Sequence, residues 1–292
     1  MLNLVLYEIK KHSKAMIIEN AIIMALLTFI LVLYKLNKTI LFRLSGFILS
    51  LPKEIHELLG INTRTQTGNL AFYILYALML INIALIWISC SRVFKLIYDD
   101  EKNGRLLSLC NQAYSKGELC ISKYLSALFT FYIQHIIIYL YSIMFIWFFS
   151  FNYQQQVSGV KRLLILISIS LIVIKLYISV TFVFSIVRNS LVPSDNWLCL
   201  IIFLPIILGN IYKLGTAFST LVNQLGMNTI SIFEKLPWTA KLNVLSPLSY
   251  LNPFTEQDAK AVVVIIIVCI IMSAGCLFCS YNSYKDREFY ID

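Results

Sequence analysis

Charged residues are scarce in this sequence. Of its 292 residues, 13% are charged and 59% are hydrophobic, and the mean hydropathy is +0.78. Soluble domains carry about 25% charged residues, so water is not the main solvent of this chain. The formal net charge of +9 is spread over the polar segments without forming a stripe. This distribution argues against nucleic-acid binding and favours contact with anionic lipid headgroups.

The sequence also lacks the motifs of several enzyme classes. None of its ten glycines belongs to a Gly-x-x-x-x-Gly-Lys-Ser/Thr loop, so the chain cannot hydrolyse ATP by the usual means. His12, His56 and His135 stand apart from acidic clusters and from one another, and they predict no metal site. The hydrophobic runs contain no Gly-x-Ser-Gly, Glu-Glu or His-Glu-x-x-His motif of an intramembrane protease. We therefore expect no cofactor on this chain.

The seven cysteines do not form a disulfide framework. Cys276 and Cys279 have the C-x-x-C spacing, but neither a second pair nor a histidine accompanies them, as a zinc site would require. Five cysteines lie inside hydrophobic runs and two in a charged segment, and we interpret all seven as small core residues.

Six hydrophobic runs predict membrane-spanning helices. A helix needs about 20 residues to cross the hydrocarbon core of a bilayer. The weakest candidate, residues 197–211, has 15 residues and contains Pro205, so it either crosses the membrane or enters and returns. The predicted spans are residues 15–34, 70–94, 125–149, 163–187, 197–211 and 261–280. They predict an all-α integral membrane protein in which residues 1–292 form one transmembrane domain.

Further helices are expected beside the spans. Hydrophobic positions in residues 2–9 follow the i, i+3, i+4, i+7 pattern, which predicts an N-terminal interfacial helix; the alternative is a frayed terminus. The first span lacks a small-x-small cleavage site and is predicted to be a signal anchor. Residues 212–260 are too hydrophobic for a solvated loop. Their prolines and glycines predict short outer helices between the last two spans.

A charged segment, residues 99–123, separates the second and third runs. Its hydrophobic residues have helical spacing: Leu106, Leu109, Cys110 and Ala113. Acidic residues 99–101 come just before them, where negative charge stabilises a helix N-terminus. The pattern predicts a short amphipathic helix over about residues 104–114, and the alternative is an ordinary solvated turn between two spans.

The charged segment resembles the one that follows the second span in permeases of ABC-2 type transporters. Those permeases have a glutamate-rich start followed by Gly-Thr-Leu-Glu, Leu-Leu-Ser, Pro-Val-Ser-Arg and Gly-Lys. The matching positions are Glu101, Gly104, Leu106 and Leu109, then Ser115-Lys116 for Ser-Arg and Ser122-Lys123 for Gly-Lys. The departures are Arg105 for Thr, Leu107 for Glu and Ala113 for Pro.

The resemblance covers nearly the whole chain. Residues 51–61 and 67–73 are similar to the stretch outside the membrane and the entry into the second span. Residues 245–253 are similar to the Leu-Ser-Pro-x-x-Tyr-x-x-Pro stretch before the last span, and residues 284–289 to the basic closing tail.

The resemblance implies the membrane subunit of a bacterial ABC exporter in the cytoplasmic membrane. Two permeases, identical or paralogous, would assemble with two copies of an ATP-binding subunit that holds ATP and Mg. The charged segment would be the cytoplasmic coupling helix, with both termini inside the cell. Counts of Lys and Arg, 12 inside and 11 outside, do not decide this orientation. The implied coupling residues are Glu101, Gly104, Arg105, Leu106, Leu109, Cys110, Ala113, Ser115 and Lys116.

Four polar residues lie near the middle of predicted spans: Lys175, Asn82, Gln134 and His135. An ionised group at this depth costs about 2.5–3.5 kcal/mol on insertion scales, so such residues line a path for cargo or fix helix packing. Glu19 and Asn20 lie about one turn inside the first span, where we expect interfacial hydration.

The cargo that the resemblance favours is an amphipathic or antimicrobial peptide or a hydrophobic compound. Lipid, glycan or ion cargo is the alternative within the same family. An ATP-independent channel and an intramembrane enzyme are the alternatives from other classes.

Overall fold

The computed structural model describes residues 2–36, 70–102, 114–150, 152–187, 194–224 and 259–285. Every element in these ranges is a helix, which confirms the all-α prediction for this part of the chain. The helices are α1 (Leu2–Leu36), α4 (Leu70–Lys102), α6 (Lys116–Phe149), α7 (Tyr153–Val187), α8 (Ser194–Gln224) and α10 (Ala259–Lys285).

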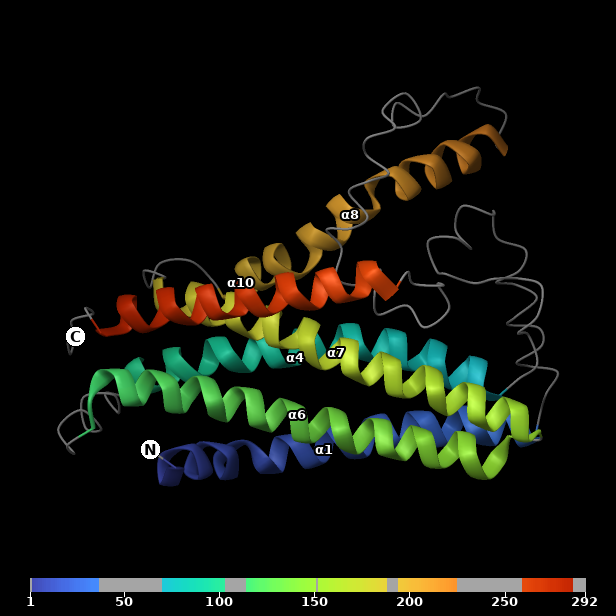
Figure 1. Ribbon diagram of the computed structural model, residues 1–292, viewed down its shortest axis with the longest axis horizontal. Coiled ribbons are helices and arrows are strands. Elements are labelled where there is room, and N and C mark those ends of the chain that lie inside the picture. The colour runs from blue at the N-terminus through green and yellow to red at the C-terminus, as the bar shows by residue number, and fades with distance from the viewer. Residues whose placement is uncertain are drawn as a thin grey trace.

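Five of the helices run side by side as a bundle (Figure 1). α7 contacts α4, α6 and α10, whereas α1 packs on the other side of the bundle against α6 and α4. The N-terminus of the chain and the end of α10 lie at the same end of the bundle as the end of α4 and the start of α6 (Figure 1). We call this the N-terminal end.

Among the described residues, five helices are long and apolar enough to cross a membrane: α1, α4, α6, α7 and α10. This supports a multi-pass membrane protein. The group does not include α8, which contains Pro205 and contacts the bundle through a Trp87–Phe203 ring contact with centroids 5.9 Å apart. The number of six spans therefore stays a prediction.

The prediction of a separate N-terminal interfacial helix is wrong. α1 is one continuous helix of 35 residues, because residues 2–36 contain neither proline nor glycine to end it. The predicted apolar face is also divided, since Val5 is buried whereas Leu2 and Leu6 are exposed.

The helices extend beyond their predicted spans. α6 and α7 contain 34 and 35 residues, which at 1.5 Å per residue makes each about 50 Å long, against about 30 Å of hydrocarbon. A capping box sets the start of α6: Ser115 Oγ accepts from the Glu118 amide at 3.2 Å, and the Ser115 amide donates to Glu118 Oε2 at 3.0 Å. α6 therefore begins nine residues before the predicted span.

The core lies between α4, α6 and α7, where hydrophobic side chains such as Leu85, Ile138 and Ile178 are fully buried. The outer faces of α1 and α10 are apolar and exposed, as at Ile22, Phe29 and Ile271. These faces suit contact with lipid.

Two predicted elements fall largely outside the described residues. The amphipathic helix at about 104–114 lies almost entirely in residues 103–113. Of the predicted outer helices in 212–260, residues 212–224 continue α8 and residues 225–258 are not described.

Candidate functional site

Polar side chains recur on the facing surfaces of α1, α4 and α6, and we call this set the polar seam. Its members are Lys11, His12 and Glu19 of α1, Asn82, Ser89, Arg92 and Asp100 of α4, and Lys123, Thr130, Gln134 and His135 of α6. Within each helix most of these residues are three, four, seven or eight positions apart, which brings them to one face. Three groups of hydrogen bonds connect residues of the seam.

The first group lies at the N-terminal end of the bundle. Lys123 forms an ion pair with Asp100 Oδ2, and both side chains are 1% exposed. Lys123 Nζ also donates to the Leu96 carbonyl at 3.0 Å. The other oxygen of Asp100 accepts from Lys11 Nζ at 3.3 Å. We call Lys11, Asp100 and Lys123 the end cluster.

The second group joins α1, α4 and α6 near the middle of α1. Arg92 forms an ion pair with Glu19 Oε2, and Gln134 Nε2 donates to the same oxygen at 3.1 Å. Arg92 Nη1 also donates to Gln134 Oε1 at 3.4 Å. Glu19 is thus paired within the bundle and Asn20 is buried, so our expectation of interfacial hydration for these two residues is wrong. Seventeen residues of helix precede Glu19, which places it about 25 Å from the start of α1.

The third group is fully buried between α4 and α6. Asn82 Nδ2 donates to the Tyr139 hydroxyl at 2.9 Å, and His135 Nε2 lies 3.1 Å from Asn82 Oδ1. An amide oxygen only accepts, so His135 carries its hydrogen on Nε2. The His135 ring stacks on Tyr139 with centroids 5.6 Å apart. These contacts hold the Asn82 amide in one orientation.

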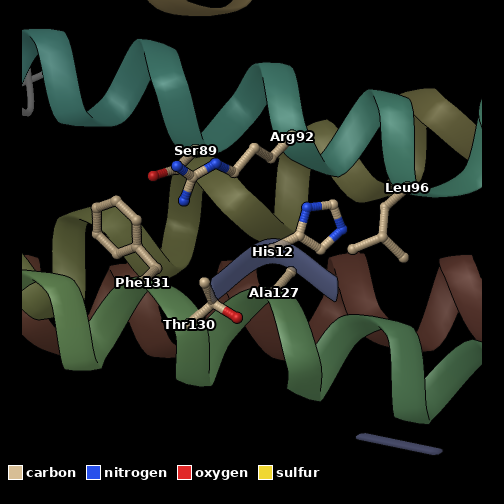
Figure 2. A pocket seen from close by; sticks show the side chains of 7 residues that line it. All are labelled: His12, Ser89, Arg92, Leu96, Ala127, Thr130 and Phe131. Atoms are coloured by element: carbon tan, nitrogen blue, oxygen red, sulfur yellow. The ribbon is translucent and has the colours of Figure 1, made fainter. Parts of the chain in front are cut away.

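A small cavity of about 20 Å³ opens between the first two groups. Figure 2 shows Ser89, Arg92 and Leu96 of α4 above it, Ala127, Thr130 and Phe131 of α6 below it, and His12 entering from α1. The hydroxyls of Ser89 and Thr130 donate to the backbone carbonyls of Leu85 and Ser126, each at 2.7 Å. Their oxygen lone pairs therefore remain as acceptors beside the Arg92 guanidinium, in a space the size of about one water molecule.

The four predicted path residues do not form one site. Asn82 and His135 are hydrogen-bonded to each other, and Gln134 belongs to the neighbouring group around Glu19. Lys175 is half-buried on α7 and joins neither group; within the described ranges no group pairs with its amine. The hydrogen bonds of Asn82, Gln134 and His135 fit a role in helix packing, whereas the position of Lys175 leaves both interpretations open.

The predicted coupling residues lie at the edge of the described part. Gly104, Arg105, Leu106, Leu109, Cys110 and Ala113 are outside it. Glu101 is in the last turn of α4, Ser115 caps α6, and Lys116 is the first residue of α6. The prediction that these residues contact another subunit stays a prediction.

Sequence reasoning missed the pairing of Glu19 with Arg92 and of Asp100 with Lys123. A hydropathy average treats each charged residue separately. In the structure, three basic residues of the seam, Lys11, Arg92 and Lys123, pair with two acidic ones, Asp100 and Glu19. The helical spacing of these charges was the available signal. In the described ranges no group of three His, Cys, Asp or Glu residues could hold a metal ion.

Comparisons with known proteins gave no match: no family model, no curated protein and no solved structure is similar to this chain at a significant level.

Proposed function

We propose that this chain is the membrane-embedded permease subunit of an ATP-driven exporter. Two permeases would work with two copies of a separate ATP-binding subunit, which binds ATP and Mg and hydrolyses the nucleotide. The chain itself is proposed to have no enzymatic activity. Its cargo would be an amphipathic or antimicrobial peptide or a hydrophobic compound.

The observation that carries the proposal is that α4 ends and α6 begins at the same end of the bundle (Figure 1). The charged segment that joins them, residues 99–123, has the motifs that resemble an ABC-2 coupling helix. Both helices run the length of the bundle, so a force on the segment would reach the membrane interior through rigid elements. An ATP-binding subunit outside the membrane can apply its force to a segment of this kind.

Exposed basic side chains lie near both ends of the bundle. Lys10, Lys14, Lys95 and Lys285 are exposed near the N-terminal end, and Lys35, Lys161 and Arg162 near the opposite end. These residues therefore do not decide the orientation. The proposed location, a bacterial cytoplasmic membrane with both termini inside the cell, rests on the resemblance of the charged segment to a cytoplasmic coupling helix.

The cargo assignment comes from composition and the family resemblance. A sequence rich in isoleucine, lysine and asparagine is typical of low-GC bacteria. Prominent exporters of the resembled family in these bacteria move amphipathic or antimicrobial peptides.

The decisive experiment tests whether this chain binds an ATP-binding subunit and stimulates its ATP hydrolysis. The tagged chain is co-expressed with the ATP-binding subunit encoded beside it, purified and reconstituted into vesicles. We expect the two proteins to co-purify and the permease to stimulate ATP hydrolysis. Leu106→Asp and Leu109→Asp should abolish both effects, because they place charge on the apolar face proposed to dock. Leu164→Asp tests an exposed apolar position on α7 and should leave co-purification unchanged.

A neighbouring gene for an ATP-binding subunit would support the exporter. Unchanged co-purification and ATP hydrolysis in both variants of the charged segment would refute the coupling assignment.

An ATP-independent ion channel is the second candidate, because the polar seam places charged groups deep in the bundle. The same vesicles distinguish the two functions. A channel would conduct ions without nucleotide and without the second subunit, whereas an exporter would move cargo only when ATP is hydrolysed.

A further inference from the structure

Asp100 connects three helices at the point where the chain leaves the bundle. It lies two residues before the end of α4, and residues 103–113 follow directly. One carboxylate oxygen pairs with Lys123 of α6 and the other accepts from Lys11 of α1. Asp100 and Lys123 are each 1% exposed, whereas Lys11 is 34% exposed. A single buried carboxylate therefore ties α4 to both α6 and α1.

Lys123 is held by two groups on the same face of α4. Its amine pairs with Asp100 and donates to the Leu96 carbonyl, one helical turn earlier. Lys123 is also only seven residues after the start of α6. The contact thus joins the end of α4 to the beginning of α6, on either side of residues 103–113 in the sequence.

A buried ion pair resists gradual separation. Pulling the two helix ends apart would leave a charge buried without its partner, which is strongly unfavourable. The ends of α4 and α6 are therefore either joined or fully separated, and small forces on the connecting segment would move them together.

We propose that Asp100 and Lys123 are positioning residues that make α4 and α6 respond as one body to a push on residues 103–113, and that Lys11 extends the movement to α1. This inference rests on the proposed function, because the ATP-binding subunit supplies the push. Without the pair, part of the movement would be lost in separating the helix ends, and less cargo would be moved for each ATP hydrolysed.

The first test needs only the chain itself. Spin labels are attached at Lys95→Cys on α4 and Phe129→Cys on α6, both exposed positions, after the other cysteines have been replaced. We expect a single narrow distance distribution for the parent and for Lys123→Arg, which keeps the charge. Asp100→Asn should broaden the distribution, whereas Lys14→Gln, at an exposed position on α1, should not.

The double variant Asp100→Asn/Lys123→Gln guards against misfolding, because it removes both buried charges and leaves only the partly exposed Lys11 without its carboxylate partner. A distribution as narrow as the parent's in this double variant would overturn the proposal. A broadened distribution in a variant that is folded and monodisperse would support it.

The second test measures coupling in vesicles that contain the ATP-binding subunit, with a fluorescent cationic amphipathic peptide as the probe. We expect the double variant to retain the bound ATP-binding subunit but to move about fivefold less peptide per ATP hydrolysed. A parent that neither binds the subunit nor uses ATP would refute the proposed function, while the distance measurement would still report on the ion pair. A parent that is active and a double variant with the same peptide-to-ATP ratio would refute only the positioning role.

Discussion

At the residue scale, several buried polar groups of the seam form hydrogen bonds with side chains on neighbouring helices. Lipid provides no hydrogen bonds, so a polar side chain inside a bundle needs a protein partner. Asn82 meets this need with two residues of α6, His135 and Tyr139. The group is fully buried and compact, which makes it a contact of fixed geometry between two helices.

Replacing Asn82 should weaken this contact. Asn82→Leu removes the hydrogen bonds that Asn82 forms with the His135 N–H and the Tyr139 hydroxyl, and we expect a loss of about 1–2 kcal/mol in the free energy of unfolding. Denaturation in mixed detergent micelles measures the change. Ser168→Ala is the control, because the exposed Ser168 hydroxyl bonds only to the Leu164 carbonyl of its own helix. Equal stability of the two variants would contradict the role of Asn82.

Gly117 permits a close approach between the start of α6 and the end of α10. A Cβ atom at this position would lie 2.7 Å from the Tyr281 ring, whereas one at Gly275 would meet nothing within 4 Å. We therefore expect Gly117→Ala to destabilise the protein by about 1–3 kcal/mol through overpacking.

The matched control is Gly275→Ala, which should be neutral or stabilising because alanine favours helix. Thermal unfolding in detergent distinguishes these outcomes. The double variant Gly117→Ala/Tyr281→Ser should recover stability relative to Gly117→Ala, and failure to recover would show that the ring is not the cause.

Lys175 tests whether the predicted path includes α7. It is half-buried, and in the described part of the chain it belongs to none of the three hydrogen-bonded groups of the polar seam. If it lines the path of the proposed exporter, Lys175→Ala should lower peptide transport in the reconstituted vesicles by about tenfold without changing protein yield. Transport equal to that of the parent would remove Lys175 from the path.

At the scale of elements, α1 is attached to the bundle by buried apolar side chains such as Leu27 and Leu31 and by polar contacts. Most of its spanning surface is exposed, and its described partners include Asp100, Arg92, Gln134 and Tyr141. Apolar side chains facing lipid supply little net attraction between helices, so hydrogen bonds and ion pairs have a larger share in fixing α1.

A double-mutant cycle on Glu19 and Arg92 tests this attachment. Glu19→Gln and Arg92→Gln each leave a charge without its partner at a partly buried site, and each should cost about 1–3 kcal/mol. The double variant removes both charges, so its loss should be smaller than the sum of the single losses by at least about 1 kcal/mol. Unfolding in detergent gives the four free energies, with Lys14→Gln as an exposed control on α1. Additive losses would show that the pair contributes no coupling.

At the scale of the whole molecule, the bundle has two chemically different ends. The N-terminal end contains the N-terminus of the chain, the end of α4 and the start of α6 (Figure 1). The end cluster joins the helices there. The opposite end has the start of α7. The orientation of the proposed exporter requires the first of these ends to face the cytoplasm.

Cysteine labelling tests the orientation. A variant with Cys110 as its sole cysteine should react with a membrane-impermeant maleimide only after the cells are permeabilised. A sole cysteine from Gln154→Cys, at an exposed position at the start of α7, should react in intact cells. Labelling of Cys110 from outside intact cells would reverse the orientation and refute a cytoplasmic coupling segment.

Three predicted boundaries coincide with helix boundaries: the start at Leu70 and the end at Phe149, both at the opposite end of the bundle, and the end at Val187. α7 departs at its start, because it begins ten residues before the predicted Leu163. At the N-terminal end two predictions are too short: α4 continues to Lys102 and α6 begins at Lys116. In a hydropathy profile, a charged residue marks the end of a span. In the structure Asp100 and Lys123 pair with each other, so α4 and α6 can both remain helical beyond these residues.

Hydrophobicity along the chain was enough to establish a multi-pass helical membrane protein, because burying apolar side chains in lipid depends on composition and run length. Which polar residues meet was settled only by packing, since residues as distant as Glu19 and Gln134 become neighbours through the arrangement of three helices. Lys11, Asp100 and Lys123 lie far apart in the linear chain or on different helices. Once the helices pack, ion pairs and hydrogen bonds join them into one cluster around the buried Asp100 carboxylate.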